Sequence, residues 1–362
     1  MRVGLVCPYS LTVPGGVQGQ VLGLARSLRR LGHEVRVLGP CDGPPPDPGV
    51  TPLGSSVPTA ANGSVAPLAP DPSAQLRTIR ALRDEAFDVV HLHEPIAPGP
   101  TMTTLLFGDT PMVGTFHAAG VSAAYRFLGW GLQRLARRLD HRCAVSPDAR
   151  ELAQRYLGGT YQLLFNGVEL DRFASGPVTP TDRPTIFFLG RHEPRKGLDV
   201  LLEALRDLPA DIRVWVGGEG PQTEELKARH AGDERIEWLG RISDAEREAR
   251  MRGCTVYCSP SIRGESFGMV LLEAMAAGCA LVASDLDGHR NVATDGVDAL
   301  LAPVGDAAAL AKAICRVLED EALRADLIAS GRRRAEELSM DRLAVRYVEI
   351  YQALLAGHPA RG

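Results

Sequence analysis

Residues 3–39 read "VGLVCPYSLTVPGGVQGQVLGLARSLRRLGHEVRVLG", and this stretch decides the fold. Its apolar start is typical of a buried strand, and the amphipathic stretch after the Pro-Gly-Gly turn predicts a helix. The run "HEVRVLG" then predicts a second strand, so the stretch indicates a βαβ unit with parallel strands. Gly15 and Gly16 indicate either a strained backbone or a neighbour that must come close to it. Residues 41–72, rich in Pro, Gly and Ser, are expected to form long irregular connections with at most a short strand at "VTPLG".

The alternation of apolar runs and helix-length segments continues along the chain. In the first half the runs are "FDVVHLHEP", "PMVGTFHA", "HRCAVSP" and "YQLLFNGVE", and a second series begins with "PTIFFLGR". The sequence therefore predicts an α/β fold of two Rossmann-like, doubly wound parallel-sheet domains that face each other across a cleft. We expect domains at 1–170 and 184–338, a linker at 171–183, and a C-terminal helix in 339–362 that packs back towards the first domain.

The composition is that of a soluble two-domain protein. The chain has 362 residues, of which 45% are apolar, and its formal net charge of −4 gives no reason to expect a nucleic-acid partner. Seven scattered Cys without a CxxC pair predict reduced thiols in a cytoplasmic protein, not a disulfide frame or a zinc site. No apolar run reaches the roughly 18 residues of a membrane span, and no signal peptide is recognisable. We therefore expect any membrane contact to be peripheral.

Basic and glycine-rich turns follow the predicted strands of the second half. Arg191 and Lys196, in "LGRHEPRKG", come directly after a strand and before a helix. Two cations at this edge can clamp a diphosphate with the help of N–H groups at the helix start, although two solvated surface cations are an alternative interpretation. The turn "VGGEGP" at 216–221 lies at the same edge of the same sheet.

The segment "GESFGMVLLEAMAAG" at 264–278 carries the strongest functional signal. Glu265 lies in the loop at the positive end of a predicted helix, which favours a carboxylate. Seven residues separate it from Glu273 inside the helix. We expect one carboxylate to face a sugar and the other to accept hydrogen bonds from a ribose. The alternative is a helix-terminal charge and an exposed helix Glu.

Histidines end two strands of the first half. His117, in "GTFHA", lies where a ligand is expected and is a candidate for a functional role. In "HLHEP", His91 and His93 share one strand face and Glu94 follows them. No third ligand has the spacing of a metal site, so we expect structural roles for His91 and His93 and predict no metal site.

Two helical stretches are basic. One carries Arg77, Arg80 and Arg83, and the other carries Arg126 among aromatic residues. Basic and aromatic residues on an amphipathic helix are suited to an anionic membrane surface. A solvated helix face is the alternative.

Taken together, these motifs resemble those of the retaining glycosyltransferases of family 4, which have the GT-B fold. "GRHEPRKG" and the segment from Glu265 to Glu273 carry the resemblance, which spans essentially the whole chain. "CPYSLTVPGGVQ", "NGSVA", "HLHEP" and "GTFH" are most similar to the phosphatidylinositol mannosyltransferases of actinobacteria. The resemblance implies transfer of a hexose, mannose from GDP-mannose, onto phosphatidylinositol or a related acceptor at the inner membrane face. It implies no tightly bound cofactor and leaves Mg²⁺ open.

The resemblance also implies a role for each matching residue. His117 and Glu265 would be catalytic, and Tyr9, Asn62 and Ser64 would line the acceptor site. The donor would be bound by Gly16, Arg191, Lys196, Ile242, Asp244, Glu265, Ser266, Phe267, Gly268 and Glu273.

Three positions depart from the family's pattern. Pro67 stands where the family has an Arg that contacts the lipid phosphate, and Ala118 and Ser122 replace a Thr and a Lys. The acceptor phosphate thus loses its expected cations, so the resemblance fixes the donor chemistry more firmly than the acceptor. The alternatives are a soluble family-4 enzyme that uses another nucleotide sugar, such as a UDP-sugar, with a polyol, sugar-phosphate or natural-product acceptor, and an epimerase or inactive relative of the same fold.

Overall fold

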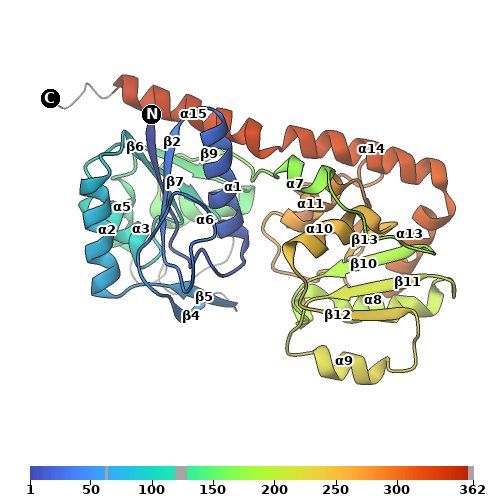
Figure 1. The fold of residues 1–362 in the computed structure, drawn as a ribbon. Coiled ribbons are helices and arrows are strands. Elements are labelled where there is room, and N and C mark those ends of the chain that lie inside the picture. The colour runs from blue at the N-terminus through green and yellow to red at the C-terminus, as the bar shows by residue number, and fades with distance from the viewer. Residues whose placement is uncertain (62–63, 119–128, 358–362) are drawn as a thin grey trace. The chain divides into compact units, whose positions relative to one another are not determined.

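The computed structural model describes residues 1–61, 64–118 and 129–357 (Figure 1). The chain divides into two compact units: unit 1 is Met1–Gly167 with Met340–Gly362, and unit 2 is Val168–Ser339. Each unit is built around its own parallel sheet with a hydrophobic core. The predicted class of fold, α/β with two doubly wound parallel sheets, is therefore confirmed.

Unit 1 contains a sheet of seven parallel strands in the order β3-β2-β1-β6-β7-β8-β9. The strands are β1 (Arg2–Val6), β2 (Glu34–Gly39), β3 (Val50–Pro52), β6 (Val89–His93), β7 (Met112–Phe116), β8 (His141–Ala144) and β9 (Gln162–Leu163). The strand order reverses between β1 and β6, as in Rossmann folds. The loops after these two strands therefore border the crevice in which such sheets bind ligands.

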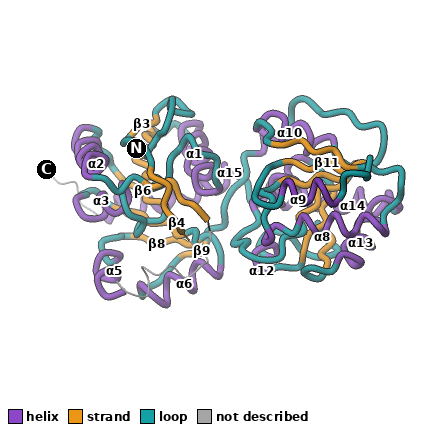
Figure 2. The backbone as a smooth tube through the Cα atoms, turned by 90° about the horizontal axis from the view of Figure 1, so that it is seen from below, coloured by secondary structure: helices purple, strands orange, loops and turns teal. Residues whose placement is uncertain are grey.

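Helices cover both faces of this sheet (Figures 1 and 2). They are α1 (Gly16–Arg30), α2 (Pro72–Asp84), α3 (Pro100–Phe107), α5 (Gly129–Ala136), α6 (Pro147–Leu157) and α15 (Met340–Gly357). The first and last of them, α1 and α15, share one core with the sheet, and the other four contribute to a second core on the opposite face. Both α2 and α6 begin with a proline whose preceding residue, Asp71 or Ser146, caps the helix with its side chain.

The segment 41–72 is more regular than its composition suggests. The short strand expected at "VTPLG" is β3, but residues 57–68 also form an antiparallel hairpin of β4 (Val57–Ala61) and β5 (Ser64–Leu68). The expectation of irregular connections was therefore wrong for this hairpin. Pro58 and Pro67, which lie opposite each other in register, hide the strand pattern, and proline is tolerated here because both strands of a two-stranded hairpin are edges.

Unit 2 contains six parallel strands in the order β12-β11-β10-β13-β14-β15. The strands are β10 (Thr185–Leu189), β11 (Arg213–Gly217), β12 (Ile236–Gly240), β13 (Val256–Ser259), β14 (Ala280–Ser284) and β15 (Leu300–Ala302). Numbered within the unit, this is the 3-2-1-4-5-6 order typical of dinucleotide-binding Rossmann folds. The order reverses between β10 and β13, which places a second ligand crevice at the loops after those strands.

The helices of unit 2 flank this sheet on both faces (Figure 1). They are α7 (Leu170–Ala174), η1 (Pro194–Lys196), α8 (Leu198–Ala204), η2 (Leu205–Asp207), α9 (Thr223–Arg229), α10 (Asp244–Gly253), α11 (Met269–Ala277), α12 (Asp287–Arg290), α13 (Ala307–Glu319) and α14 (Glu321–Glu337). Residues of α8, α9, α13 and α14 form one core with the strands.

The segment 171–183, expected to be a linker, lies within unit 2. The division of the chain falls before Val168 and after Ser339, and these two residues pair in an isolated parallel bridge. Within the expected linker, Phe173 of α7 is buried, and Arg172 donates a 2.8 Å hydrogen bond to Glu248 of α10. The Pro- and Thr-rich sequence that follows hid this short helix, because its stability comes from packing on α10 and α11 and not from its own length.

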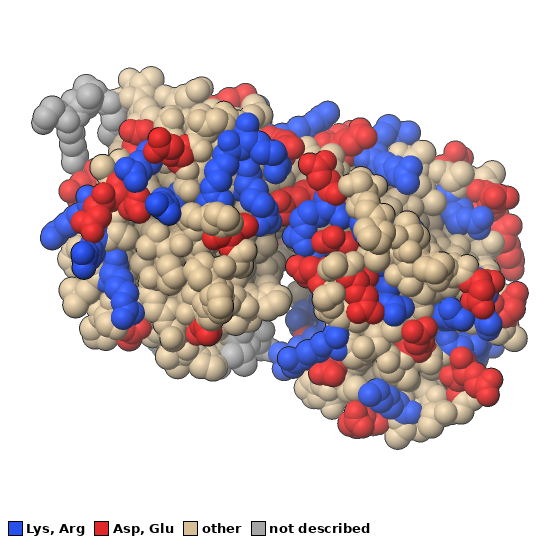
Figure 3. All heavy atoms as spheres, in the orientation of Figure 1, with Lys and Arg blue, Asp and Glu red and all other residues tan. Residues whose placement is uncertain are grey.

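Charged groups of both signs share the surface of unit 2. On the face drawn in Figure 3, Lys and Arg side chains lie beside Asp and Glu side chains. Ion pairs of unit 2 include Arg290 with Asp285 at 2.6 Å. Among the helices of the described ranges, none is both long and apolar enough to cross a membrane.

Candidate functional site

The loop after β10 and the loop after β13 meet at the reversal point of the sheet in unit 2. Lys196, at the end of η1, places its Nζ 2.6 Å from Oε1 of Glu265. The backbone joins the same loops, because the N–H of Ile262 donates to the carbonyl of Arg195 at 2.8 Å. Gly197 has a φ of +65°, and a side chain there would collide with the carbonyl of Pro260. Two of the predicted donor residues, Lys196 and Glu265, are thus in direct contact.

Glu265 is a largely buried carboxylate with specific partners. Its side chain is 12% exposed, and Oε1 also accepts a 2.9 Å hydrogen bond from the Ser261 hydroxyl. Burial alone would raise the pKa of Glu265, but the Lys196 ammonium outweighs it, helped by His289 and Ser261, and holds the pKa below its usual value. The carboxylate is therefore ionised at neutral pH.

The short helix α12 packs against the loop that carries Glu265. Gly288 of α12 touches the backbone of Glu265 so closely that a Cβ there would overlap its carbonyl, and Asn291 donates a 3.2 Å hydrogen bond to the carbonyl of Ser266. Phe267 is buried, and Gly268 adopts a left-handed φ of +78° where α11 begins. The predicted donor loop, Ser266 to Gly268, is therefore fixed by packing, and it ends at the N-terminus of α11.

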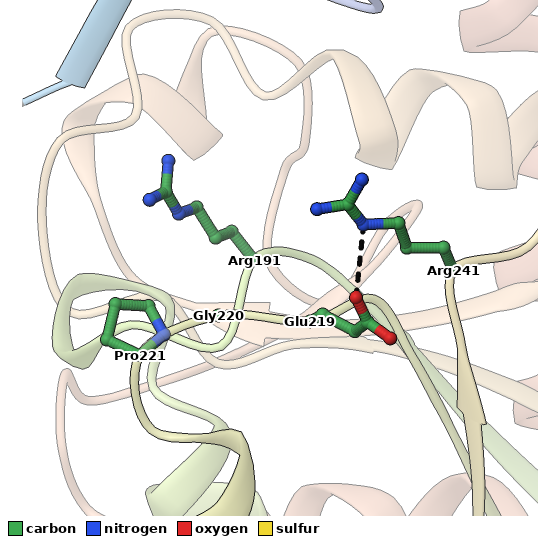
Figure 4. A pocket seen from close by; sticks show the side chains of 5 residues that line it. All are labelled: Arg191, Glu219, Gly220, Pro221 and Arg241. Atoms are coloured by element: carbon green, nitrogen blue, oxygen red, sulfur yellow. Dashed lines mark ion pairs between the residues drawn. The ribbon is translucent and has the colours of Figure 1, made fainter.

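A hollow of about 500 Å³ opens at the same edge of unit 2 and is lined by Arg191, Glu219, Gly220, Pro221 and Arg241 (Figure 4). The Arg191 and Arg241 guanidinium groups extend on the same side of the loop that carries Glu219. Arg241 Nε lies 3.1 Å from Glu219 Oε2, but the Arg241 side chain is 87% exposed. Arg191 Nε lies 3.7 Å from Glu193 Oε2, and the Arg191 side chain is 55% exposed. Ion pairs this exposed are weak, so both cations can turn to an anionic ligand.

The glycine-rich turn beside this hollow is held by His192. Its Nδ1 lies 2.9 Å from the Thr223 hydroxyl oxygen, which accepts a 2.8 Å hydrogen bond from the N–H of Gly220. Gly218 has a φ of +105°, and a Cβ there would overlap the carbonyl of Gly190. The turn thus needs glycine because it packs directly on the loop that carries Arg191.

Glu273 belongs to a half-buried network of charges on α7, α10 and α11. Its Oε2 lies 3.7 Å from Arg247 Nη1 and has no hydrogen-bond partner in the structure. Burial raises the pKa of Glu273, although Arg247 and Arg172 oppose this effect. Asp244 lies 3.2 Å from Arg172 and 3.6 Å from Arg247, so the predicted donor residues Asp244 and Glu273 share one arginine. Ile242 packs beside Gly217 at the end of β11.

In unit 1, three histidine rings form a buried row on neighbouring strands. His117 Nε2 lies 3.0 Å from His93 Nδ1, and the rings of His93 and His91 stack with centroids 4.4 Å apart. Burial lowers the pKa of His117 and of His91 to about 3. His117, predicted to be catalytic, is therefore a neutral imidazole at physiological pH.

Glu94 fixes the backbone around His117. One carboxylate oxygen, Oε1, accepts hydrogen bonds from the N–H groups of His117 at 2.6 Å and of Ala118 at 2.5 Å. Glu94 itself has a left-handed φ of +51°, a conformation that costs free energy in a residue other than glycine. Burial raises the pKa of Glu94 to about 7, although the two N–H groups lower it in part.

Two of the predicted acceptor residues, Tyr9 and Ser64, lie at the hairpin of unit 1. Tyr9 forms an isolated antiparallel bridge with Leu68, and the N–H of Ser10 donates to the carbonyl of Pro67 at 2.9 Å. Ser64 is the first residue of β5. Asn62, Ser122 and Arg126 lie outside the described residues.

Gly16 is the first residue of α1, whose N-terminus carries no side-chain cap. A Cβ on Gly16 would meet no atom within 4 Å, so the fold of unit 1 does not itself require glycine here. Gly15, the N-cap, has an extended backbone, but a Cβ there would collide with the side-chain amide of Gln18. The N–H groups of this helix start are suited to an anion.

Four residues of the site were missed or underrated by the sequence analysis. Arg241 and Glu219 escaped because exposed charges at strand ends are common, although "VGGEGP" marked the turn that carries Glu219. His93 and Glu94 were noticed in "HLHEP", but only the pairing of β6 with β7 brings them to His117. In the described part of the chain, no group of three or more His, Cys, Asp or Glu residues has the arrangement of a metal site.

Comparison with known proteins gives the family. Residues 14–172 match the model described as Glycosyltransferase Family 4, and residues 171–334 match the model described as Glycosyl transferases group 1. The phosphatidyl-myo-inositol mannosyltransferase of Mycobacterium leprae is 40% identical over 98% of this chain and 97% of its own length. The chain belongs to glycosyltransferase family 4. The predicted resemblance is therefore confirmed, and the protein is a glycosyltransferase.

Other relatives of this family-4 glycosyltransferase agree. The phosphatidyl-myo-inositol mannosyltransferase of Propionibacterium freudenreichii is 38% identical over 88% of this chain and 87% of its own length. Among solved structures, a sucrose-phosphate synthase from Thermosynechococcus elongatus has a TM-score of 0.76 at 21% identity, covering 99% of this chain and 100% of its own. Anabaena HepE in complex with UDP and glucose has a TM-score of 0.72 at 18% identity, covering 98% and 100%. These two likenesses concern the fold, which is the GT-B fold.

The raised pKa of Glu94 gives the glycosyltransferase a pH-dependent stability. Because the folded pKa of about 7 lies above the ordinary 4.5, Glu94 stabilises the fold most below pH 4.5, and this contribution is lost as the pH rises through 7. Glu94→Gln keeps an oxygen acceptor but cannot ionise. We expect the difference in thermal unfolding midpoint, Glu94→Gln minus wild type, to increase from about pH 5 to about pH 8. Glu34→Gln, at a side chain that is 81% exposed, is the control, and an equal offset for Glu94→Gln at both pH values would contradict the assignment.

Proposed function

We propose that this glycosyltransferase moves a mannosyl group from GDP-mannose onto phosphatidylinositol or a closely related acceptor, with retention of configuration. One observation carries the proposal: relatives named phosphatidyl-myo-inositol mannosyltransferase are 38–40% identical over 88–100% of this chain. A retaining family-4 enzyme needs a site for a nucleoside diphosphate, and the edge of unit 2 supplies the cations and the N–H groups for one.

In the proposed reaction, the donor diphosphate is bound by Arg191, by Lys196 and by the helix start at Gly16. The bond between the anomeric carbon and the phosphate oxygen breaks, and the diphosphate gains negative charge that the preorganised cations stabilise. The acceptor hydroxyl forms the new bond on the same face of the sugar, and its proton goes to the departing phosphate. The ionised Glu265 orients the sugar hydroxyls, and Glu273, with its unpartnered Oε2, accepts a hydrogen bond from the ribose.

His117 is the proposed contact of unit 1 with the reactants, and Tyr9, Asn62 and Ser64 line the proposed acceptor site. With its pKa near 3, His117 is neutral and acts by hydrogen bonding and not as a charge. We propose no tightly bound cofactor, and Mg²⁺, if the reaction uses it, accompanies the diphosphate.

Transfer assays with a panel of nucleotide sugars test this proposal. The donors are GDP-mannose, GDP-glucose, UDP-glucose and UDP-N-acetylglucosamine, each offered with phosphatidylinositol vesicles, with free inositol phosphate and without acceptor. We expect the highest kcat/KM for GDP-mannose with phosphatidylinositol. Parallel assays with EDTA, and with Mg²⁺ restored, measure any metal requirement. Transfer from a UDP-sugar alone, or no transfer to the lipid, would refute the proposal.

The helix start at Gly16 gives a second test with a matched control. Gly16→Ala and Gly19→Ala each add a Cβ that meets no atom within 4 Å, and each should keep or slightly raise the stability of α1. We expect only Gly16→Ala to raise KM for the donor, by about tenfold, because its methyl group obstructs the diphosphate. Equal KM values for the two variants would remove Gly16 from the donor site.

We also propose that α2 contacts an anionic membrane surface. Its buried residues are Ala74, Thr78 and Ala81. On the opposite side of the helix, Leu76 is 68% exposed, the Arg80 side chain is 83% exposed, and Arg83 follows one turn later. Arg77, in contrast, turns back to donate a 3.4 Å hydrogen bond to the carbonyl of Leu53. An apolar residue beside exposed arginines supports interfacial binding.

Co-sedimentation with vesicles tests this surface. The double variant Arg80→Glu/Arg83→Glu should bind phosphatidylinositol-containing vesicles at least about tenfold more weakly, since each cation near an anionic surface contributes about 1 kcal/mol. Raising the salt concentration should weaken wild-type binding in the same way. Lys312→Glu/Arg333→Glu makes the same charge change on exposed helix positions of unit 2 and is the control. Equal binding by both double variants would exclude α2 from the membrane contact.

A second candidate acceptor is a small phosphorylated polyol. The D-inositol 3-phosphate glycosyltransferase of Xylanimonas cellulosilytica is 29% identical over 96% of this chain, and Pro67 and Ala118 offer no cations for a lipid phosphate. The assays with free inositol phosphate test this candidate. If the natural acceptor is a small phosphorylated polyol, free inositol phosphate will be a better acceptor than phosphatidylinositol.

A further inference from the structure

The contact between His93 and His117 in unit 1 raises the question of which ring nitrogen carries the proton between them. His93 Nδ1 and His117 Nε2 lie 3.0 Å apart, so one of them carries a proton and the other accepts it. Burial lowers the pKa of both rings, so each is neutral and carries a single proton. The other nitrogen of His93, Nε2, is buried and has no hydrogen-bond partner.

The unpartnered Nε2 of His93 decides which of the two rings donates the hydrogen bond between them. If His117 donated to His93, the His93 proton would have to lie on Nε2, as a buried N–H without an acceptor. If His93 donates, its Nε2 is a buried acceptor without a donor. Among backbone groups, a buried N–H without a partner is rarer than an under-satisfied acceptor, and we apply the same preference to these imidazole nitrogens. The proton between the rings therefore belongs to His93 Nδ1.

We propose that His93 is a positioning residue that fixes the tautomer of His117. With Nε2 of His117 occupied as an acceptor, the single proton of that ring lies on Nδ1. His117 then offers the reactants an N–H donor and not a base. This inference rests on the proposed function only where it assigns a consequence to the tautomer, and the tautomer itself is a property of the folded protein.

Neighbouring groups hold the two rings in place. His91 stacks on His93 and is itself fixed at both nitrogens, since its Nδ1 lies 2.7 Å from the Tyr351 hydroxyl and its Nε2 lies 2.7 Å from the Thr115 hydroxyl. On the other side, Glu94 binds the N–H groups of His117 and Ala118. His93 has lost almost all solvent contact, at 2% exposure, so water does not compete for its proton.

A donor at His117 Nδ1 suits the proposed transfer. An N–H group stabilises oxygen atoms that gain negative charge, but it cannot take the proton of the acceptor hydroxyl. That proton must then go to the departing phosphate, as same-face attack requires. The His93 contact thus excludes His117 as the general base.

Long-range ¹H–¹⁵N correlation spectra of the ¹⁵N-histidine-labelled full chain test the tautomer directly. Comparison with His117→Gln assigns the ring, and the expected pattern has a protonated Nδ1 and an unprotonated Nε2. A protonated Nε2 in the wild type would overturn the proposal without bearing on whether the protein is a transferase. This measurement needs no variant of His93 to fold.

Kinetics of two His93 variants test the consequence. His93→Phe keeps a ring but removes the donor, and His93→Asn places an amide N–H near the position of Nδ1. We expect kcat to fall about tenfold or more in His93→Phe and to recover in part in His93→Asn, with little change in KM for the donor sugar. Equal losses in both variants, with an unchanged His117 tautomer, would overturn the positioning role. Absence of transfer in the wild type with the expected tautomer would refute the proposed function alone.

Discussion

A single, largely buried ion pair joins two loops at the reversal point of the sheet in unit 2. Lys196 follows β10 and Glu265 follows β13, and these neighbouring strands are the ones between which the chain reverses its direction of winding. Removing either partner would leave a charge in a poorly solvated place, which is far more costly than losing an exposed pair. The pair also keeps an ammonium group ready for an anion, because Lys196 can share its three N–H donors between Glu265 and a ligand.

In unit 1, buried hydrogen bonds around neutral imidazole rings hold the corresponding loops. At its reversal point, the loop after β6 carries Glu94, which holds the main chain at His117 by two hydrogen bonds. Histidines, a threonine and tyrosines of α15 complete a buried polar cluster there. A low local dielectric strengthens such hydrogen bonds and penalises any that are left unmade, so the cluster tolerates few alternative arrangements. The two units thus use opposite means, paired charges and neutral rings, to preorganise their loops.

The sequence predicted the layout of the molecule better than its contacts. Alternating apolar runs and helices specify parallel sheets, and the segment from Glu265 to Glu273 specifies the family, because both signals are local. The hairpin of β4 and β5 was missed because its prolines argue against strands until the pairing is known. The helix α7 was taken for linker because Phe173 and Arg172 are stabilised by partners more than 70 residues away. His93 was expected to have only a structural role for the same reason, since its partner His117 follows another strand, β7.

The path of the chain sets the order in which the two units can fold during synthesis. Unit 2 is one uninterrupted stretch, Val168–Ser339, inserted into unit 1, whose last helix comes from the final residues of the chain. A nascent chain can therefore complete unit 2 while unit 1 still lacks α15. Until Tyr347 and Tyr351 leave the ribosome, His91 lacks the Tyr351 hydroxyl and Thr115 lacks the Tyr347 hydroxyl, and the core on that face stays open. Unit 1, whose synthesis begins first, is thus the last of the two units to be complete.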